Sequence, residues 1–172
     1  LIPLYQKSIP SNLLVYGKPG TGKTLVVKKV LKQIQERVDK NTYPIKLAYT
    51  NAKHESTLYG LLVSLGKQLG LKSKKDSEDD KLFLPDTGLA ISEVFNRILY
   101  VIGKNKMNTV FVIDEIDYLA ELVSKTGKDI LYSITRANER LENGSLSLIG
   151  VSNDLTFKER LDPRVISSLS EE

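Results

Sequence analysis

The stretch GKPGTGKT (17–24) decides the fold, because it joins two contrasting patterns through a turn rich in glycine. The apolar run NLLVY (12–16) before it is typical of a short buried strand. After it, apolar residues recur with helical spacing from Lys23 to about Asp39. The turn also occupies every fixed position of the pattern G-x-x-x-x-G-K-[ST]. The stretch therefore predicts a strand, a phosphate-binding loop and a helix in direct succession.

The residue types in this loop suit the binding of a nucleotide. Glycine lets backbone N–H groups turn inward around phosphate oxygens, and the N-terminus of the following helix adds a positive dipole. Lys23 can reach the β- and γ-phosphates, and the Thr24 hydroxyl can ligate Mg²⁺. An accidental glycine-rich turn is the alternative, and the flanking strand and helix patterns argue against it. The predicted nucleotide-binding residues are Gly17, Lys18, Pro19, Gly20, Thr21, Gly22, Lys23, Thr24 and Leu25.

Strand and helix patterns alternate through the rest of the chain. Continuous apolar strands that alternate with helices indicate a parallel sheet covered on both faces. The predicted fold class is therefore α/β, a doubly wound parallel sheet. The charged stretch 71–81 is predicted to be a solvated loop. Further strands are predicted at 44–51, 109–115 and 146–152, and further helices at 56–70, 88–103 and 125–141.

Acidic and polar side chains follow two of these strands. VFVIDEID (110–117) places Asp114 and Glu115 at the carboxyl edge of the sheet, where ligands bind in open α/β folds. Asp114 is predicted to hold Mg²⁺, directly or through water, and Glu115 to polarise the attacking water as a general base. IGVSND (149–154) ends in the same way, and the neutral amide of Asn153 could orient that water. The alternatives are structural: the acids could begin a helix, and the asparagine could cap a turn.

Composition sets broad limits on the class of protein. A chain of 172 residues with 41% apolar and 27% charged residues fits one globular domain. The absence of cysteine excludes disulfides and thiolate metal sites and suits a reducing cytosol. The net charge of +4 permits contact with nucleic acid but does not indicate it.

In this order, the phosphate loop, the paired acids and the asparagine-bearing strand resemble an AAA+ ATPase. The segment 131–172 resembles more closely the origin-recognition and replication-licensing initiator ATPases (Orc/Cdc type), and the archaeal branch fits best. NDLTFKERLDPRV (153–165) is characteristic of that family, and YTNAKHEST (49–57) is similar to its second-strand segment. The resemblance extends from about residue 11 to residue 172.

The resemblance implies one partial AAA+ nucleotide-binding domain over 1–172, with Walker A at 17–24, Walker B at 110–115 and a sensor strand at 146–153. It implies ATP or ADP and Mg²⁺ as cofactors, with slow hydrolysis. The implied function is a replication initiator that recognises origins and helps to load the replicative helicase, with ATP as an assembly switch. The alternatives are another AAA+ ATPase, such as a clamp loader or transposition helper, and a nucleotide-binding scaffold with little hydrolysis.

The resemblance also implies partners and a location. Origin DNA, contacted mainly through a winged-helix domain, other initiator subunits and the replicative helicase are the expected partners, with no membrane. The expected location is cytoplasmic and associated with the nucleoid. An initiator-specific helical element is implied near 80–97, where most side chains are expected to be solvated.

Two further residues receive roles from the resemblance. Asn51 would end the second strand beside Glu115 and hold that acid away from water; an ordinary turn asparagine is the alternative. Arg164 would be an arginine finger that reaches the nucleotide of a neighbouring subunit; an ion pair with Asp162 is the alternative. Some relatives carry a second arginine where this chain has the serines 167–168.

The resemblance further implies a fifth strand, a helical lid and a winged-helix domain beyond residue 172. The chain is therefore expected to be a piece of a longer protein in which strand 12–16 has an open edge. Without the lid, weak nucleotide binding and poor hydrolysis are expected.

Overall fold

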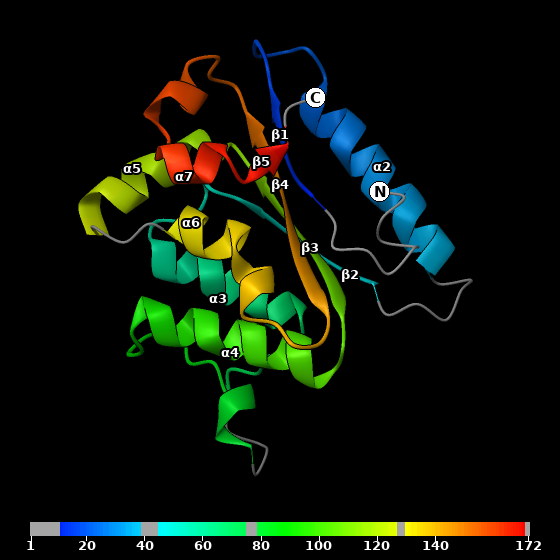
Figure 1. The fold of residues 1–172 in the computed structure, drawn as a ribbon, viewed down its shortest axis with the longest axis vertical. Coiled ribbons are helices and arrows are strands. Elements are labelled where there is room, and N and C mark those ends of the chain that lie inside the picture. The colour runs from blue at the N-terminus through cyan, green and yellow to red at the C-terminus, as the bar shows by residue number, and fades with distance from the viewer. Residues whose placement is uncertain (1–10, 39–44, 75–78, 127–129, 171–172) are drawn as a thin grey trace.

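The computed structural model describes residues 11–38, 45–74, 79–126 and 130–170, and it shows a parallel sheet with helices on both faces (Figure 1). The order across the sheet is β2-β3-β4-β1-β5, and every pair of neighbours is parallel. The predicted α/β class with a doubly wound parallel sheet is confirmed. The strands are β1 (Asn12–Tyr16), β2 (Ile45–Asn51), β3 (Asn108–Asp114), β4 (Ser145–Ser152) and β5 (Leu169–Ser170).

The register of the sheet brings the carboxyl ends of three strands together. Asn51 at the end of β2 is opposite Asp114 at the end of β3, and Asp114 is opposite Val151 in β4. In β4, Val151 and Ser152 pair with the end of β1, directly before the glycine-rich loop. Side chains from separate segments of the sequence therefore meet at one edge of the sheet.

Helices cover the two faces of the sheet unequally (Figure 1). α2 packs on one face, where Val110 and Val112 of β3 join its apolar side. The opposite face carries the larger core, in which Phe111 and Ile113 of β3 lie under the other helices. Alternation along β3, which is buried from Thr109 to Asp114, thus supplies both cores. The helices are α2 (Lys23–Val38), α3 (Leu58–Gln68), α4 (Ile91–Lys104), α5 (Asp117–Thr126), α6 (Ile130–Thr135) and α7 (Pro163–Ile166).

The ends of α3 follow the signals in its sequence. The Thr57 hydroxyl accepts a hydrogen bond from the N–H of Gly60 at 3.0 Å, and Gly70 adopts a φ of 101° just after the helix. The predicted helix 56–70 is thus confirmed to within two residues. Residues 75–78 of the predicted loop 71–81 lie outside the described part of the structure, and in the described part Lys72 forms a β-bridge with Phe83. Three short 3₁₀ helices complete the described elements: η1 (Asp80–Leu82), η2 (Ala137–Glu139) and η3 (Phe157–Arg160).

The predicted helix over 125–141 is confirmed only in part: Ile130–Thr135 is helical, residues 127–129 lie outside the described part of the structure, and the helix does not continue to 141. α6 ends at Thr135, and η2 follows as a separate element. The backbone oxygen of Thr135 accepts from the Asn12 side chain at 3.1 Å, and the Asn138 amide bonds both backbone groups of Leu146 at 2.8 Å. These contacts with the sheet replace the interactions that would continue the helix. The paired acids do not begin a helix: Asp114 ends β3, Glu115 has a positive φ, and α5 begins two residues later at Asp117.

The expected open edge of β1 is also corrected. Leu169 and Ser170 form β5 and pair in parallel with Asn12 and Leu13, so a strand beside β1 is present within the chain. α7 begins at Pro163 with the Asp162 carboxylate as its N-cap and directs the chain back toward β1. Within the described residues, no helix is both long and apolar enough to span a membrane.

Candidate nucleotide-binding site

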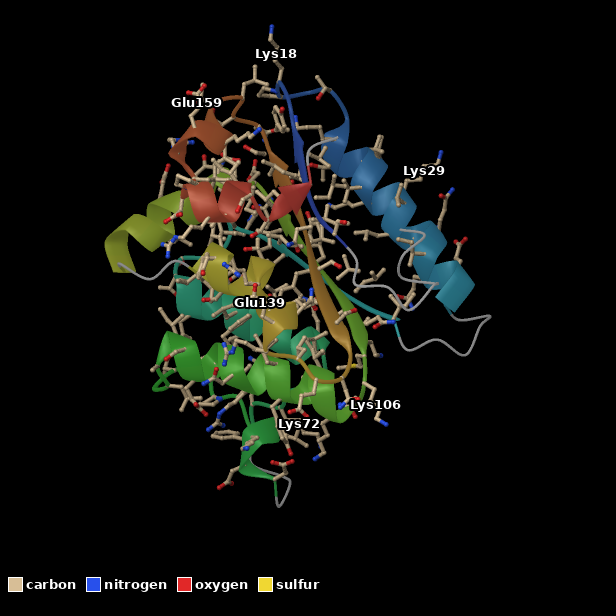
Figure 2. The ribbon with its side chains drawn as sticks, viewed as in Figure 1. Lys18, Lys29, Lys72, Lys106, Glu139 and Glu159 are labelled. Atoms are coloured by element: carbon tan, nitrogen blue, oxygen red, sulfur yellow. The ribbon has the colours of Figure 1, made fainter. Side chains whose placement is uncertain are left out.

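The glycine-rich loop folds around the lysine that follows it. The Lys23 ammonium donates to the backbone oxygens of Gly17 and Lys18, each at 2.8 Å. Gly20 and Gly22 adopt φ values of 78° and 82°, which residues with a Cβ rarely adopt, so this loop conformation favours glycine at both positions, although only Gly22 is a fixed position of the pattern. In Figure 2, Lys18 marks the end of the molecule at which the loop lies.

α2 begins at Lys23, and its first turn therefore faces the loop. The first N–H groups of a helix have no acceptor within the helix, which makes this end suited to phosphate oxygens. Leu25 and Val26 follow on the same turn and are 72% and 60% exposed, although they are large and apolar. The predicted nucleotide-binding residues therefore form one continuous segment at the accessible edge of the sheet.

Thr24 and Asp114 bring two oxygen donors together from opposite halves of the sequence. Thr24 Oγ1 donates to Asp114 Oδ1 at 3.2 Å, and the Asp114 side chain is buried. Mg²⁺ prefers oxygen ligands, and nucleotide sites usually supply one or two protein oxygens beside phosphate and water. Thr24 and Asp114 could thus hold Mg²⁺, as the sequence predicted. Among the described residues, no cluster of three or more His, Cys, Asp or Glu side chains forms a metal site by itself.

Glu115 lies at a sharp change of chain direction. Its φ of 50° is unusual for a residue with a side chain, and the next N–H, from Ile116, donates to Val151 O at 2.9 Å. Asn153 Nδ2 lies 3.5 Å from Glu115 Oε1, at the outer limit of a hydrogen bond. The structure thus brings the predicted general base and the predicted sensor asparagine together at the ends of β3 and β4.

Asn51 has the geometry of a turn asparagine, and Arg164 forms an ion pair with Asp162. Asn51 Oδ1 accepts from the N–H of Lys53 at 2.9 Å, the geometry of a turn asparagine, while its backbone stands one residue from Glu115 in the sheet register. Arg164 forms a forked pair with Asp162, with nitrogen–oxygen distances of 3.0 and 2.7 Å. The Arg164 guanidinium also lies over the ring of Tyr132, 4.6 Å from its centroid.

Two residues of the site were missed by the sequence reasoning. Tyr49 donates its hydroxyl to Asp114 Oδ2 at 2.9 Å. Burial, followed by that hydrogen bond and by the charges of Asp114 and Glu115, raises the pKa of the Tyr49 phenol above its ordinary value, so it remains a donor at neutral pH. Asp117 accepts from Ser152 Oγ at 2.8 Å and thereby fixes the end of β4 that leads to Asn153.

Faint signals for both residues are present in the sequence. Tyr49 stands two positions before Asn51, so the alternation of a strand places both side chains on one face. Asp117 is the third acid of the run DEID, at the first position of α5. Neither signal identifies the residue that the Tyr49 or Asp117 side chain contacts, because these contacts depend on the register between strands.

Comparisons with known proteins agree with this geometry. Over 100% of this chain, the sequence is 67% identical to an ORC1-type DNA replication protein of Cenarchaeum symbiosum (strain A), of which 40% is covered. The fold is similar to the solved structure of the Aeropyrum pernix ORC1 protein in complex with DNA, with a TM-score of 0.83 and 36% identity over 100% of this chain and 41% of that chain. It is also similar to the Aeropyrum pernix ORC2 protein in ADPNP–ADP complexes, with a TM-score of 0.75 and 19% identity over 98% of this chain and 42% of that chain, which shows the fold alone.

The chain spans about 40% of the length of the curated relatives it matches. A family model described as the AAA domain matches residues 7–157, a range that contains the glycine-rich loop, the paired acids and Asn153. The fold and the arrangement of these groups agree with that match. The chain belongs to the AAA domain family.

Proposed function

We propose that the chain is the ATP-binding and ATP-hydrolysing part of a DNA replication initiator of the ORC1 type. The observation that carries this proposal is the meeting of Thr24, Asp114, Glu115 and Asn153 at one edge of the sheet, beside the glycine-rich loop. The names of its relatives supply the biological setting, since they are ORC1-type DNA replication proteins.

Each group has a separate role in this proposal. The loop amides and Lys23 hold the phosphates, and Mg²⁺ when bound would neutralise charge on the β- and γ-phosphate oxygens. Glu115 accepts a proton from the attacking water, and Asn153 orients that water. Hydrolysis at this site is slow, as the resemblance implies, and signals a state of assembly rather than driving rapid turnover.

The wider roles of the protein form the second part of the proposal. ATP acts as an assembly switch at origins, with origin DNA, other initiator subunits and the replicative helicase as partners, in association with the nucleoid. Arg164 serves as an arginine finger toward a neighbour after release from Asp162. Its side chain is 62% exposed, which favours such access.

Asn51 acts as a switch that holds Glu115 away from water until DNA or a partner engages. The register supports this role, because Asn51 is opposite Asp114. If Asn51→Ala left both basal and DNA-stimulated hydrolysis unchanged, the role would be refuted.

A Glu115→Gln variant tests hydrolysis and separates an ATPase from a nucleotide-binding scaffold. The amide keeps the shape of the side chain but cannot accept the proton, so we expect ATP to bind with unchanged affinity and turnover to fall at least about 100-fold. Binding is measured by isothermal titration and turnover by phosphate release. Lys23→Ala is the matched control, because it should lose ATP binding itself. Equal turnover in the unchanged protein and Glu115→Gln would contradict hydrolysis at this site and favour a scaffold.

A further inference from the structure

The two carboxylate oxygens of Asp114 have different partners. Oδ1 accepts from the Thr24 hydroxyl at 3.2 Å and from the Glu115 N–H at 3.0 Å. Oδ2 accepts from the Tyr49 hydroxyl at 2.9 Å. Because Asp114 is only 4% exposed, these donors determine which way its carboxylate is turned.

Tyr49 is itself held from several sides. Its strand β2 lies at the edge of the sheet, and the side-chain amide of Gln68 takes the place of a neighbouring strand. The Tyr49 N–H donates to Gln68 Oε1 at 2.9 Å, and Gln68 Nε2 donates to the Tyr49 carbonyl at 2.9 Å. On α2, the Lys28 ammonium lies 4.9 Å from the centroid of the Tyr49 ring. β2, α2 and α3 together fix the hydroxyl at Asp114.

We propose that Tyr49 is a positioning residue for the divalent cation that accompanies bound nucleotide. Its hydroxyl engages Oδ2 of Asp114, so that Oδ1, the oxygen already beside Thr24, is the one presented to the cation or to its bound water. Donors behind a metal-binding carboxylate fix its orientation and so raise its affinity for the metal. This inference rests on the proposed function, because it needs a nucleotide with its cation at the loop.

The Tyr49→Phe variant tests the inference, because it removes one hydroxyl and leaves the ring in place. Binding of a fluorescent ATP analogue to the protein is measured first in EDTA and then across a titration with Mg²⁺. The half-saturating Mg²⁺ concentration is expected to rise about tenfold, while the affinity in EDTA stays unchanged. A residue that only supported the fold would weaken binding equally with and without Mg²⁺.

Tyr100→Phe is a matched control. The Tyr100 hydroxyl also donates to an aspartate, Asp79 Oδ2 at 2.8 Å, but this pair links α4 to the residue before η1, away from the nucleotide loop. Its removal should leave both the affinity in EDTA and the Mg²⁺ dependence unchanged. Thermal unfolding in EDTA compares the stability of both variants with that of the unchanged protein.

The outcomes separate this inference from the proposed function. If Tyr49→Phe kept the Mg²⁺ dependence of the unchanged protein, or lost affinity equally in EDTA, the positioning role would be overturned and nucleotide binding would stand. If the unchanged protein bound no nucleotide, the proposed function would fail and the inference would fail with it. The positioning role is supported if the half-saturating Mg²⁺ concentration rises in Tyr49→Phe and not in Tyr100→Phe.

Discussion

Glu115 combines a chemical role with an unfavourable backbone conformation. Its φ of 50° lies in the left-handed region, which costs a residue with a Cβ about 1–2 kcal/mol relative to the right-handed region. The hydrogen bonds of the neighbouring residues hold it there, since Ile116 N–H donates to Val151 O and Tyr118 N–H donates to Glu115 O. Strain of this kind is typical of functional positions, where geometry is favoured over stability.

Replacement of this acid by glycine should therefore stabilise the fold and abolish hydrolysis. For Glu115→Gly we expect the free energy of unfolding to rise by about 0.5–1 kcal/mol, because glycine adopts this φ freely but loses more backbone entropy on folding. Urea denaturation measures the gain, and phosphate release measures the loss of turnover.

Lys106→Gly is the control for this prediction. Lys106 also has a φ of 50°, and it lies at the end of the molecule opposite the nucleotide loop (Figure 2). A similar gain in stability is expected there, with turnover unchanged. A loss of stability in Glu115→Gly beside a gain in Lys106→Gly would show that the Glu115 side chain makes a net favourable contribution.

At the scale of elements, one buried asparagine connects β1 with three other segments. Asn12 Nδ2 donates to the backbone oxygens of Thr135 and Ser168, both at 3.1 Å, and its Oδ1 accepts from the N–H of Leu148 at 2.9 Å. Asn12 thereby joins the end of α6, the approach to β5 and the middle of β4. Its side chain supplies hydrogen-bond partners for backbone groups at this junction that have none within a helix or strand.

Asn12→Ala should lower the free energy of unfolding by about 3 kcal/mol, because it leaves buried backbone groups without partners. Urea denaturation gives the magnitude. Asn96→Ala is the control: its carbonyl oxygen accepts from Arg140 at an exposed position, and we expect a change within about 0.5 kcal/mol. Similar losses in the two variants would contradict the role of Asn12 as a link between elements.

Local features of the fold could be predicted from the sequence, whereas contacts between distant segments, such as those of Asn12, could not. The glycine-rich loop, the strand with the paired acids and the helix capped by Thr57 were predictable, because the signal and the structure that it forms lie in one short segment. The end of α6 at Thr135 was not, because the side chain that binds the Thr135 carbonyl belongs to Asn12, which is 123 residues away in the sequence. Tyr49 was missed for the same reason, since its partner Asp114 is 65 residues away.

At the scale of the whole molecule, ion pairs stabilise two separate regions of the surface. Asp79, next to η1, accepts from the Lys104 ammonium at 2.6 Å and from Tyr100, and these two hydrogen bonds lower the pKa of its carboxyl from 3.8 to about 2. Asp162, before α7, is paired with Arg164, whose side-chain and backbone hydrogen bonds also lower the Asp162 pKa to about 2. Both carboxyls are more acidic in the folded protein than in the unfolded chain.

The sign of the pH dependence follows from these values. A carboxyl with a lowered pKa contributes stability that is fully present above about pH 4, where it is ionised in both states, and that is lost as the pH falls through about 2.

Asp79→Asn should therefore be less stable than the unchanged protein at pH 7, with a difference that shrinks between pH 4 and pH 2 and vanishes below. Urea midpoints measured across this range, with and without 1 M NaCl, test it; salt should reduce the difference at pH 7. Asp162→Asn should show the same profile, and because Asp79 pairs with Tyr100 and Lys104 of α4 whereas Asp162 pairs with Arg164 of α7, the double variant should show the sum. A difference for Asp79→Asn that stayed constant down to pH 2 would mean that packing, and not the charge of the aspartate, produces it.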